Sequence, residues 1–211
     1  MSFSLNEVEA LSKRAARGAG LDWGLVEEAA KATRWLCAQG FDGCKVLANV
    51  LTAHHVTGCP RSLDGEWRSA EGSLCPVRTG AALSDCAAQV GSVGAKMRNV
   101  SHPLFMLPFV AAAARKTKTN LQMHWPGVTV TTNGHHTDLS VSKVGNVYIE
   151  QAEQVEISLA PPLSDVDRQA VRARPDSWVL DKLNSLAALT YAPATEASRR
   201  LGAGAGQSDN D

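Results

Sequence analysis

Strand-forming sequence is concentrated in one stretch of this chain, residues 121–160, and the segments on both sides of it have helical periodicity. Val128–Thr132 alternates apolar and polar residues, and the Asn133-Gly134 pair that follows is preferred in two-residue type I′ turns. Further strands are predicted over residues 121–125, 136–142, 146–151 and 154–159. Contiguous strands between helical ends indicate an α+β fold rather than alternating α/β.

The predicted architecture is a helical N-terminal layer, a central, mainly antiparallel sheet of four to five strands, and C-terminal helices packed across it. A single domain over residues 1–204 is expected, because 211 residues are enough for one sizeable core. Its predicted parts are a helical region (1–56), an irregular connection (57–82), helices of small and apolar residues (83–118), the sheet (121–160) and C-terminal helices (164–201). Residues 205–211 are expected to form a flexible tail.

Several helix boundaries are marked in the sequence. Ser4 and Glu7 form a capping box, and Gly18 ends the helix that follows. A second helix is expected from Asp22 to Gly40 with Trp23 facing inward, and a short third helix over residues 46–51. Near the C-terminus, two helices are predicted, one over residues 164–172 and one starting at Pro175.

The charge balance excludes some classes of partner. Lys and Arg together number 21, as do Asp and Glu, so no net field attracts nucleic acid or an anionic membrane. No run approaches the roughly 18 apolar residues of a membrane span, and the N-terminus has acids where a signal peptide has bases. The cytoplasm is the expected compartment, and the low net charge mildly favours self-association.

The metal-binding and nucleophilic residue types lack the spacings of the common sites. The five cysteines contain no C-x-x-C pair and are expected to be reduced, with Cys37 a small buried residue. Neither zinc-type His/Cys spacing nor a G-x-S-x-G elbow is present. The alternating glycines of 202–206 follow a helix instead of a strand, which argues against nucleotide binding. We therefore expect no metal and assign no cofactor-binding residue.

The C-terminal residues 191–200 hold the densest group of chemically useful side chains. In the functional interpretation, Tyr191 donates a hydrogen bond, Glu196 acts as acid or base, and Arg199 or Arg200 binds a substrate carboxylate. In the alternative interpretation this is a surface helix with one Glu196–Arg199 ion pair. His124, on a predicted strand, is the remaining candidate catalytic residue.

Two resemblances add to these patterns. Leu36–Gly43, Ser101–Val110 and the tail from Thr190 resemble an uncharacterised proteobacterial family known only as a domain of unknown function, across the whole chain. Residues 4–43 resemble the helical N-terminus of the malate/L-lactate/ureidoglycolate-type dehydrogenases, which reduce 2-oxo acids with a nicotinamide cofactor. Those enzymes continue into a Ser-His-Gly element, whereas here Asp42-Gly43 leads into Cys44, so this resemblance implies a shared helical building block.

Two functions remain open. The first is a cytosolic small-molecule metabolic enzyme, or its accessory subunit, that acts on a carboxylate-bearing metabolite through His124, Tyr191, Glu196, Arg199 and Arg200. The second is a non-catalytic homo-oligomeric binding or scaffold protein whose tail docks on a neighbouring subunit. Neither interpretation includes a nucleic-acid or membrane partner.

Overall fold

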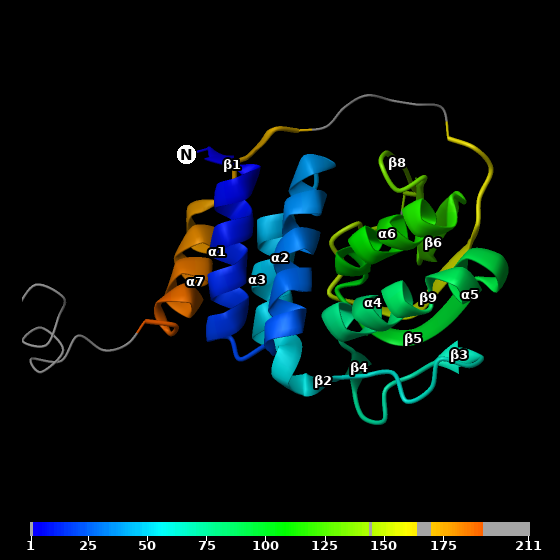
Figure 1. Ribbon diagram of the computed structural model, residues 1–211, viewed down its shortest axis with the longest axis horizontal. Helices are drawn as coiled ribbons and strands as arrows, with labels where there is room; N and C mark the ends of the chain where they lie inside the picture. The colour runs from blue at the N-terminus through cyan, green and yellow to red at the C-terminus, as the bar shows by residue number, and fades with distance from the viewer. Residues whose placement is uncertain (1, 144, 164–169, 192–211) are drawn as a thin grey trace, which may run out of the picture.

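Helices from both ends of the chain form one layer of the protein. The structure, a computed structural model, describes residues 2–143, 145–163 and 170–191. Within them α1 (Leu5–Gly18), α2 (Trp23–Ala38), α3 (Gly43–Ala53) and α7 (Ser177–Ala188) lie side by side (Figure 1). Strand β1 (Phe3–Ser4) pairs antiparallel with β10 (Arg172–Ala173) at one end of this layer. The predicted helices at both ends of the sequence are confirmed.

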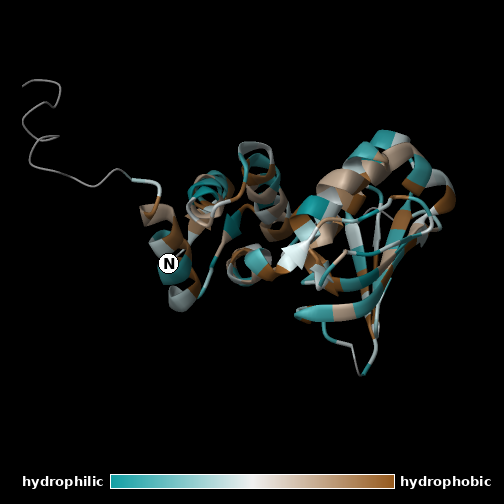
Figure 2. Ribbon diagram, turned by 90° about the horizontal axis from the view of Figure 1, so that it is seen from below, coloured by the Kyte–Doolittle hydropathy of each residue, from teal (hydrophilic) through white to brown (hydrophobic). Residues whose placement is uncertain are grey.

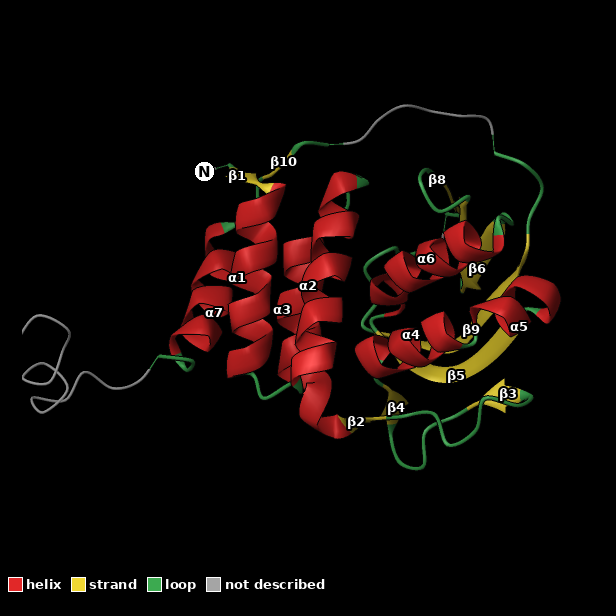
Figure 3. Ribbon diagram, viewed as in Figure 1, coloured by secondary structure: helices red, strands yellow, loops and turns green. Residues whose placement is uncertain are grey.

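The remaining strands form one mixed sheet. Its described strands are β2 (Thr57–Gly58), β3 (Glu66–Trp67), β4 (Ser73–Leu74), β5 (Ala95–Ser101), β6 (Leu121–Trp125), β7 (Val128–Thr132), β8 (Thr137–Val141) and β9 (Gln151–Leu159). They follow the order β2-β4-β5-β9-β6-β7-β8, with β3 also paired to β5. Along the part of the sheet ordered β5-β9-β6-β7-β8, each strand is antiparallel to its neighbours. At the other end, β2 pairs with β4, and β3 and β4 pair with β5, all in parallel. In Figure 3, β5 and β9 are the long curved strands.

Helices cover one face of this sheet, as Figure 2 shows. They are α4 (Pro76–Asp85), α5 (Ala87–Val93) and α6 (Leu107–Thr117). The 3₁₀ turn η2 (Pro103–Met106) leads directly into α6, and a second 3₁₀ turn, η1 (His54–Val56), follows α3. In β6, Leu121, Met123 and Trp125 are buried beneath them, whereas Gln122 and His124 alternate onto the other face. That face is polar and carries ion pairs such as Lys96–Glu156, with 3.3 Å between Nζ and Oε1.

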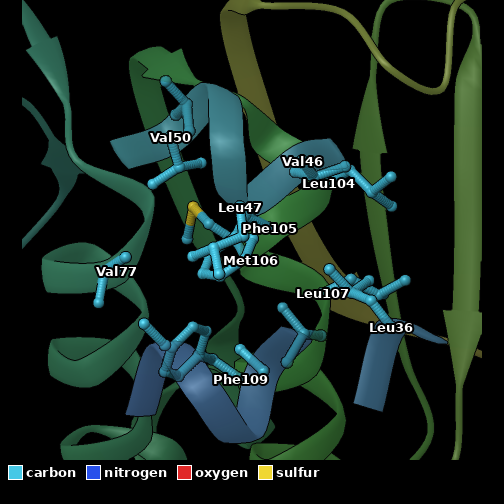
Figure 4. Close-up of a cluster of buried hydrophobic side chains, with 14 of the residues drawn as sticks. Leu36, Val46, Leu47, Val50, Val77, Leu104, Phe105, Met106, Leu107 and Phe109 are labelled. Carbon is cyan, nitrogen blue, oxygen red and sulfur yellow. The ribbon is translucent and has the colours of Figure 1, made fainter. Parts of the chain in front are cut away.

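The core is continuous between the helical layer and the sheet. Its centre is η2 and the start of α6, a run of buried apolar side chains from Leu104 to Leu107. Leu36 from α2 and Leu47 from α3 pack against this run, as Figure 4 shows. The α+β class predicted from the sequence is confirmed, with a shared core between its two layers.

The hairpin β7–β8 was predicted, but its turn was not. Thr132 and Thr137 are register partners, so the connection has four residues instead of two. The Asn133 side chain accepts hydrogen bonds from the backbone N–H groups of His135 and His136, at 2.9 and 2.8 Å. An Asx-type loop therefore forms in place of the type I′ turn, because the asparagine side chain accepts the hydrogen bonds that a backbone carbonyl would otherwise accept. The strand that was predicted to begin at His136 begins instead at Thr137, because His136 lies in the loop.

The predicted sheet of four to five strands over residues 121–160 is wrong in extent. β5 was missed, although Ala95 and Met97 alternate with Lys96 and Arg98, because it was assigned to a helical region. The predicted strand over residues 146–151 is instead a turn, in which the Asn146 side chain accepts from the backbone N–H of Tyr148 at 2.9 Å. The predicted connection 57–82 contains β2, β3, β4 and the start of α4.

The helix signals were more reliable at the N-terminus than at the C-terminus. The Ser4–Glu7 capping box is present, and its hydrogen bonds lower the pKa of the Glu7 carboxyl. Trp23, predicted to face inward, is 63% exposed and stacks beneath Arg17, with 4.7 Å between the guanidinium carbon and the ring centroid. Of the helix predicted over 164–172, residues 164–169 lie outside the described part, and Arg172 begins a strand.

Candidate functional site

The sequence-predicted site residues that the structure describes lie in different parts of the fold. Tyr191 follows α7, is exposed, and accepts a hydrogen bond from the Arg14 guanidinium at 2.7 Å. His124 is on β6, where its Nδ1 lies 3.0 Å from the Thr129 hydroxyl and Glu156 is its cross-strand neighbour. α7 and β6 are on opposite sides of the molecule (Figure 1). His124 and Tyr191 are therefore not brought together.

The other three predicted residues, Glu196, Arg199 and Arg200, lie outside the described residues, as do the glycines of 202–206. Their assignment to a site stays a prediction. What the structure adds is a pocket elsewhere, formed by segments that are distant in the sequence.

This pocket, of about 340 Å³, lies between the end of α2, the start of α3, the loop before β9 and the segment that contains β10. We call it the α2–α3 pocket. Its polar and reactive lining residues are Cys37, Asp42, Cys44, Tyr148, Arg172 and Arg174. A larger hollow of about 510 Å³ lies over residues 55–72, but one continuous segment of the chain lines it. The α2–α3 pocket is the more informative because four elements bring their side chains together there.

Asp42 and Tyr148 organise the rim of the pocket at the start of α3. The Asp42 carboxylate accepts from the Lys45 backbone N–H at 3.1 Å, which caps the helix. The Asp42 backbone N–H donates to the Tyr148 hydroxyl oxygen at 3.0 Å, and Lys45 Nζ lies 5.9 Å from the centroid of the Tyr148 ring. Because the tyrosine oxygen acts as an acceptor here, its own O–H proton is left to donate to a ligand.

Two arginines give the pocket its positive charge. The Arg172 guanidinium donates to the side chain and the backbone carbonyl of Ser2, at 3.0 and 2.8 Å. Arg174 is exposed and forms no ion pair or hydrogen bond with any described residue. Two arginines thus line the pocket together with one carboxylate, Asp42, and the fork of Arg174 is not occupied by any described residue.

Cys37 and Cys44 form a pair of thiols at the pocket wall, 4% and 2% exposed. Hydrogen bonding with the Cys44 thiol and with the backbone of Gly43 and Cys44 lowers the pKa of Cys37, and burial opposes this shift. The pKa of Cys44 is raised, because its proton is shared with Cys37 and because it is buried. The two thiols are therefore chemically unequal.

A second polar cluster lies on the other side of Tyr148. The Ser101 hydroxyl is 2.7 Å from His102 Nδ1, and the pKa of His102 is lowered by burial, with Glu150 opposing that shift. His102 has a left-handed backbone, with φ of 43°, and its N–H donates to the Glu150 carbonyl at 2.7 Å. The adjoining cavity holds only about 10 Å³, so this cluster packs the protein interior and leaves no room for a substrate.

The described residues also bear on whether the protein has a metal site or a membrane-spanning helix. No group of three or more His, Cys, Asp or Glu side chains in the described part could hold a metal ion. Among the described helices, none has the length and apolar character needed to cross a membrane.

Sequence comparison finds a family model that matches the first part of the chain. Residues 3–96 match the model of a protein of unknown function, DUF3726. This confirms the resemblance to a family known only as a domain of unknown function, over α1 to the beginning of β5. A search of curated proteins finds no match to the chain. The resemblance of residues 4–43 to the dehydrogenases stays a prediction.

The family match covers only part of the α2–α3 pocket. Cys37, Asp42 and Cys44 fall within residues 3–96, whereas Tyr148 and Arg174 lie outside. The sequence indicated a packing role for Cys37 but no relation between Cys37 and Cys44. One sequence feature could have predicted this relation. The two cysteines are close in the sequence and flank the Gly40–Gly43 turn, which reverses the chain and places α3 against α2.

Proposed function

We propose that this protein binds a small carboxylate-bearing metabolite in the α2–α3 pocket, in the cytoplasm, as a metabolic enzyme or as an accessory subunit of one. The observation that carries the proposal is a pocket with two donors that no described residue occupies, the Arg174 guanidinium and the Tyr148 hydroxyl proton. A guanidinium fork with a neighbouring hydroxyl suits a planar carboxylate, since both oxygens receive charge-assisted or neutral hydrogen bonds.

The chemistry of the pocket supports a small anion over a larger partner. Its volume of about 340 Å³ is at the lower end of small-molecule sites. The start of α3 adds the positive end of a helix dipole close to the same wall. Cys37 adds a group with nucleophilic character beside the proposed carboxylate, which is the reason to include an enzymatic role.

A thermal-shift panel tests carboxylate binding directly. Small mono- and dicarboxylates, 2-oxo acids among them, are compared with their uncharged amides. We expect a binding carboxylate to raise the melting temperature, because ligand at 100 times its Kd adds about 2.7 kcal/mol to the stability of the folded state. Arg174→Gln is expected to weaken that ligand about ten- to hundredfold, the value of a lost charge-assisted hydrogen bond.

Arg61→Gln is the matched control, since it removes one exposed arginine charge outside the α2–α3 pocket. It should leave the shift intact. Equal shifts with acids and amides, or equal weakening by both substitutions, would show that general charge and not this pocket is responsible.

A second candidate function, self-assembly, is favoured by strand β8. β8 pairs only with β7 among the described strands, and Leu139 and Val141 are 41% and 45% exposed although they stand opposite the buried Val130 and Val128. The Ser142 N–H donates to the Gly127 carbonyl, so by antiparallel alternation the backbone groups of Leu139 and Val141 point away from β7. We propose that a second copy of the chain pairs with this edge.

The sequence of β8 suits a symmetric antiparallel pair. With Ser140 on the two-fold axis, Leu139 of each copy lies opposite Val141 of the other, and no two like charges face each other. We expect light scattering to give twice the mass of one chain. Leu139→Pro should reduce that mass to one chain, because it removes an outward N–H, whereas Leu139→Thr should retain the dimer. A single-chain mass for the unaltered protein would rule out this interface.

A further inference from the structure

We propose that Cys37 and Cys44 form a two-cysteine oxidation site, in which a hydroperoxide oxidises Cys37 and Cys44 then closes a disulfide between the end of α2 and the start of α3. The proposal does not depend on carboxylate binding, although the two thiols line the same α2–α3 pocket. Three features carry it: the turn that brings the two cysteines together, the close packing of that turn against Cys37, and the position of both thiols in the pocket wall.

The turn between α2 and α3 brings the sulfurs together. Gly40 has φ of +84°, a left-handed conformation that lets the chain reverse directly after α2. Gly43 then lies against α2, because a Cβ atom there would be 2.6 Å from the Thr33 carbonyl oxygen and 3.0 Å from Cys37 Sγ. This contact places the next residue, Cys44, with its thiol donating to the sulfur of Cys37. Only six residues lie between the cysteines, so closure of the disulfide costs little further chain entropy.

The surroundings distinguish the two thiols. Hydrogen bonding from Cys44 and from the backbone at the start of α3 lowers the pKa of the Cys37 thiol, although burial opposes this shift. Asp42 opposes this effect at both sulfurs. The pKa of Cys44 is raised by its hydrogen bond with Cys37 and by burial, so Cys44 is the thiol that keeps its proton. Cys37 is therefore the thiol that attacks the peroxide. Cys44 is the thiol that then attacks the oxidised Cys37 and forms the disulfide.

The reaction balances with a hydroperoxide as the oxidant. The Cys37 thiolate attacks one peroxide oxygen and the O–O bond breaks. The sulfur becomes a sulfenic acid, and with hydrogen peroxide the other oxygen leaves as water after taking up a proton. The Cys44 sulfur then displaces the sulfenic oxygen, which leaves as a second water with the Cys44 proton. Two thiols and one hydrogen peroxide give one disulfide and two waters, and an added dithiol reverses the product.

Peptide mapping tests the proposal on the unaltered protein. Both cysteines lie between Arg34 and Lys45, so trypsin releases them in one peptide, residues 35–45. The reduced protein is treated with hydrogen peroxide in its folded state and is then alkylated under denaturing conditions. We expect this peptide to lose two hydrogens and to escape alkylation at least about tenfold faster than the peptide of Cys75, a buried cysteine outside the pocket.

Two variants assign the roles. Cys44→Ser should stop the reaction at a Cys37 sulfenic acid, which a 1,3-dione reagent traps. Cys37→Ser should leave Cys44 alkylatable at the same peroxide dose. A 35–45 peptide that keeps both thiols while the exposed Cys59 is oxidised would overturn the proposal, as would trapping at Cys44 in the absence of Cys37. Neither outcome bears on the carboxylate proposal, which is read from the thermal shift of the reduced protein.

Discussion

Leu107→Ala is expected to lower the free energy of unfolding by about 2–5 kcal/mol, the range for deletion of a fully buried leucine side chain. Leu107 begins α6, has no exposed surface, and lies in the cluster where α2, α3 and η2 meet (Figure 4). The cavity left behind is bounded by regular elements on several sides and collapses only in part. Urea denaturation measures the effect as a lower midpoint with an unchanged slope.

Leu189→Ala provides the matched control. This leucine caps α7 and is 70% exposed, so the same deletion should change the stability by no more than about 0.5 kcal/mol. Similar losses at both positions would contradict the burial described for η2 and α6.

Gly18→Ala is expected to destabilise the protein by about 1–3 kcal/mol, although alanine is the better helix former. The sequence suggested that this glycine simply ends α1. In the structure a Cβ atom at residue 18 would lie 1.8 Å from the backbone oxygen of Leu186, so α7 has to move away from α1. A backbone oxygen cannot rotate aside as a side chain does. Thermal and urea unfolding both measure the loss.

Gly24→Ala is the comparison that isolates the close contact. Gly24 lies in the first turn of α2, and a Cβ atom there would have no neighbour within 4 Å. Alanine should leave the stability unchanged or raise it by up to about 1 kcal/mol, because it restricts the unfolded chain. Destabilisation at position 24 as large as at position 18 would argue against a steric origin.

Local signals in the sequence predicted local structure well. The Ser4–Glu7 capping box and the alternation of Val128–Thr132 each specify an element through neighbouring residues, and both are found. The errors arose where a distant partner decides the outcome. β5 became strand because β9 and β4 pair with its two edges, and neither strand is near it in the sequence.

The candidate site was less predictable than the fold for the same reason. The α2–α3 pocket joins Cys37 to Tyr148 and Arg174 through three separate segments, and no spacing pattern links residues so far apart. Cys37 was correctly predicted to be buried. Burial alone did not show that Cys44, seven residues later, would return to it across a glycine turn.

The pairing of the first described elements with the last ones sets the order in which the protein can fold during synthesis. β1 needs β10, α1 needs α7, and Ser2 and Arg172, which are hydrogen-bonded, are 170 residues apart. At about 5–20 residues per second, roughly 10–30 s pass between translation of the two partners. During that time the apolar face of α1 that α7 later covers stays open to solvent, which makes it a natural place for a chaperone to hold the nascent chain.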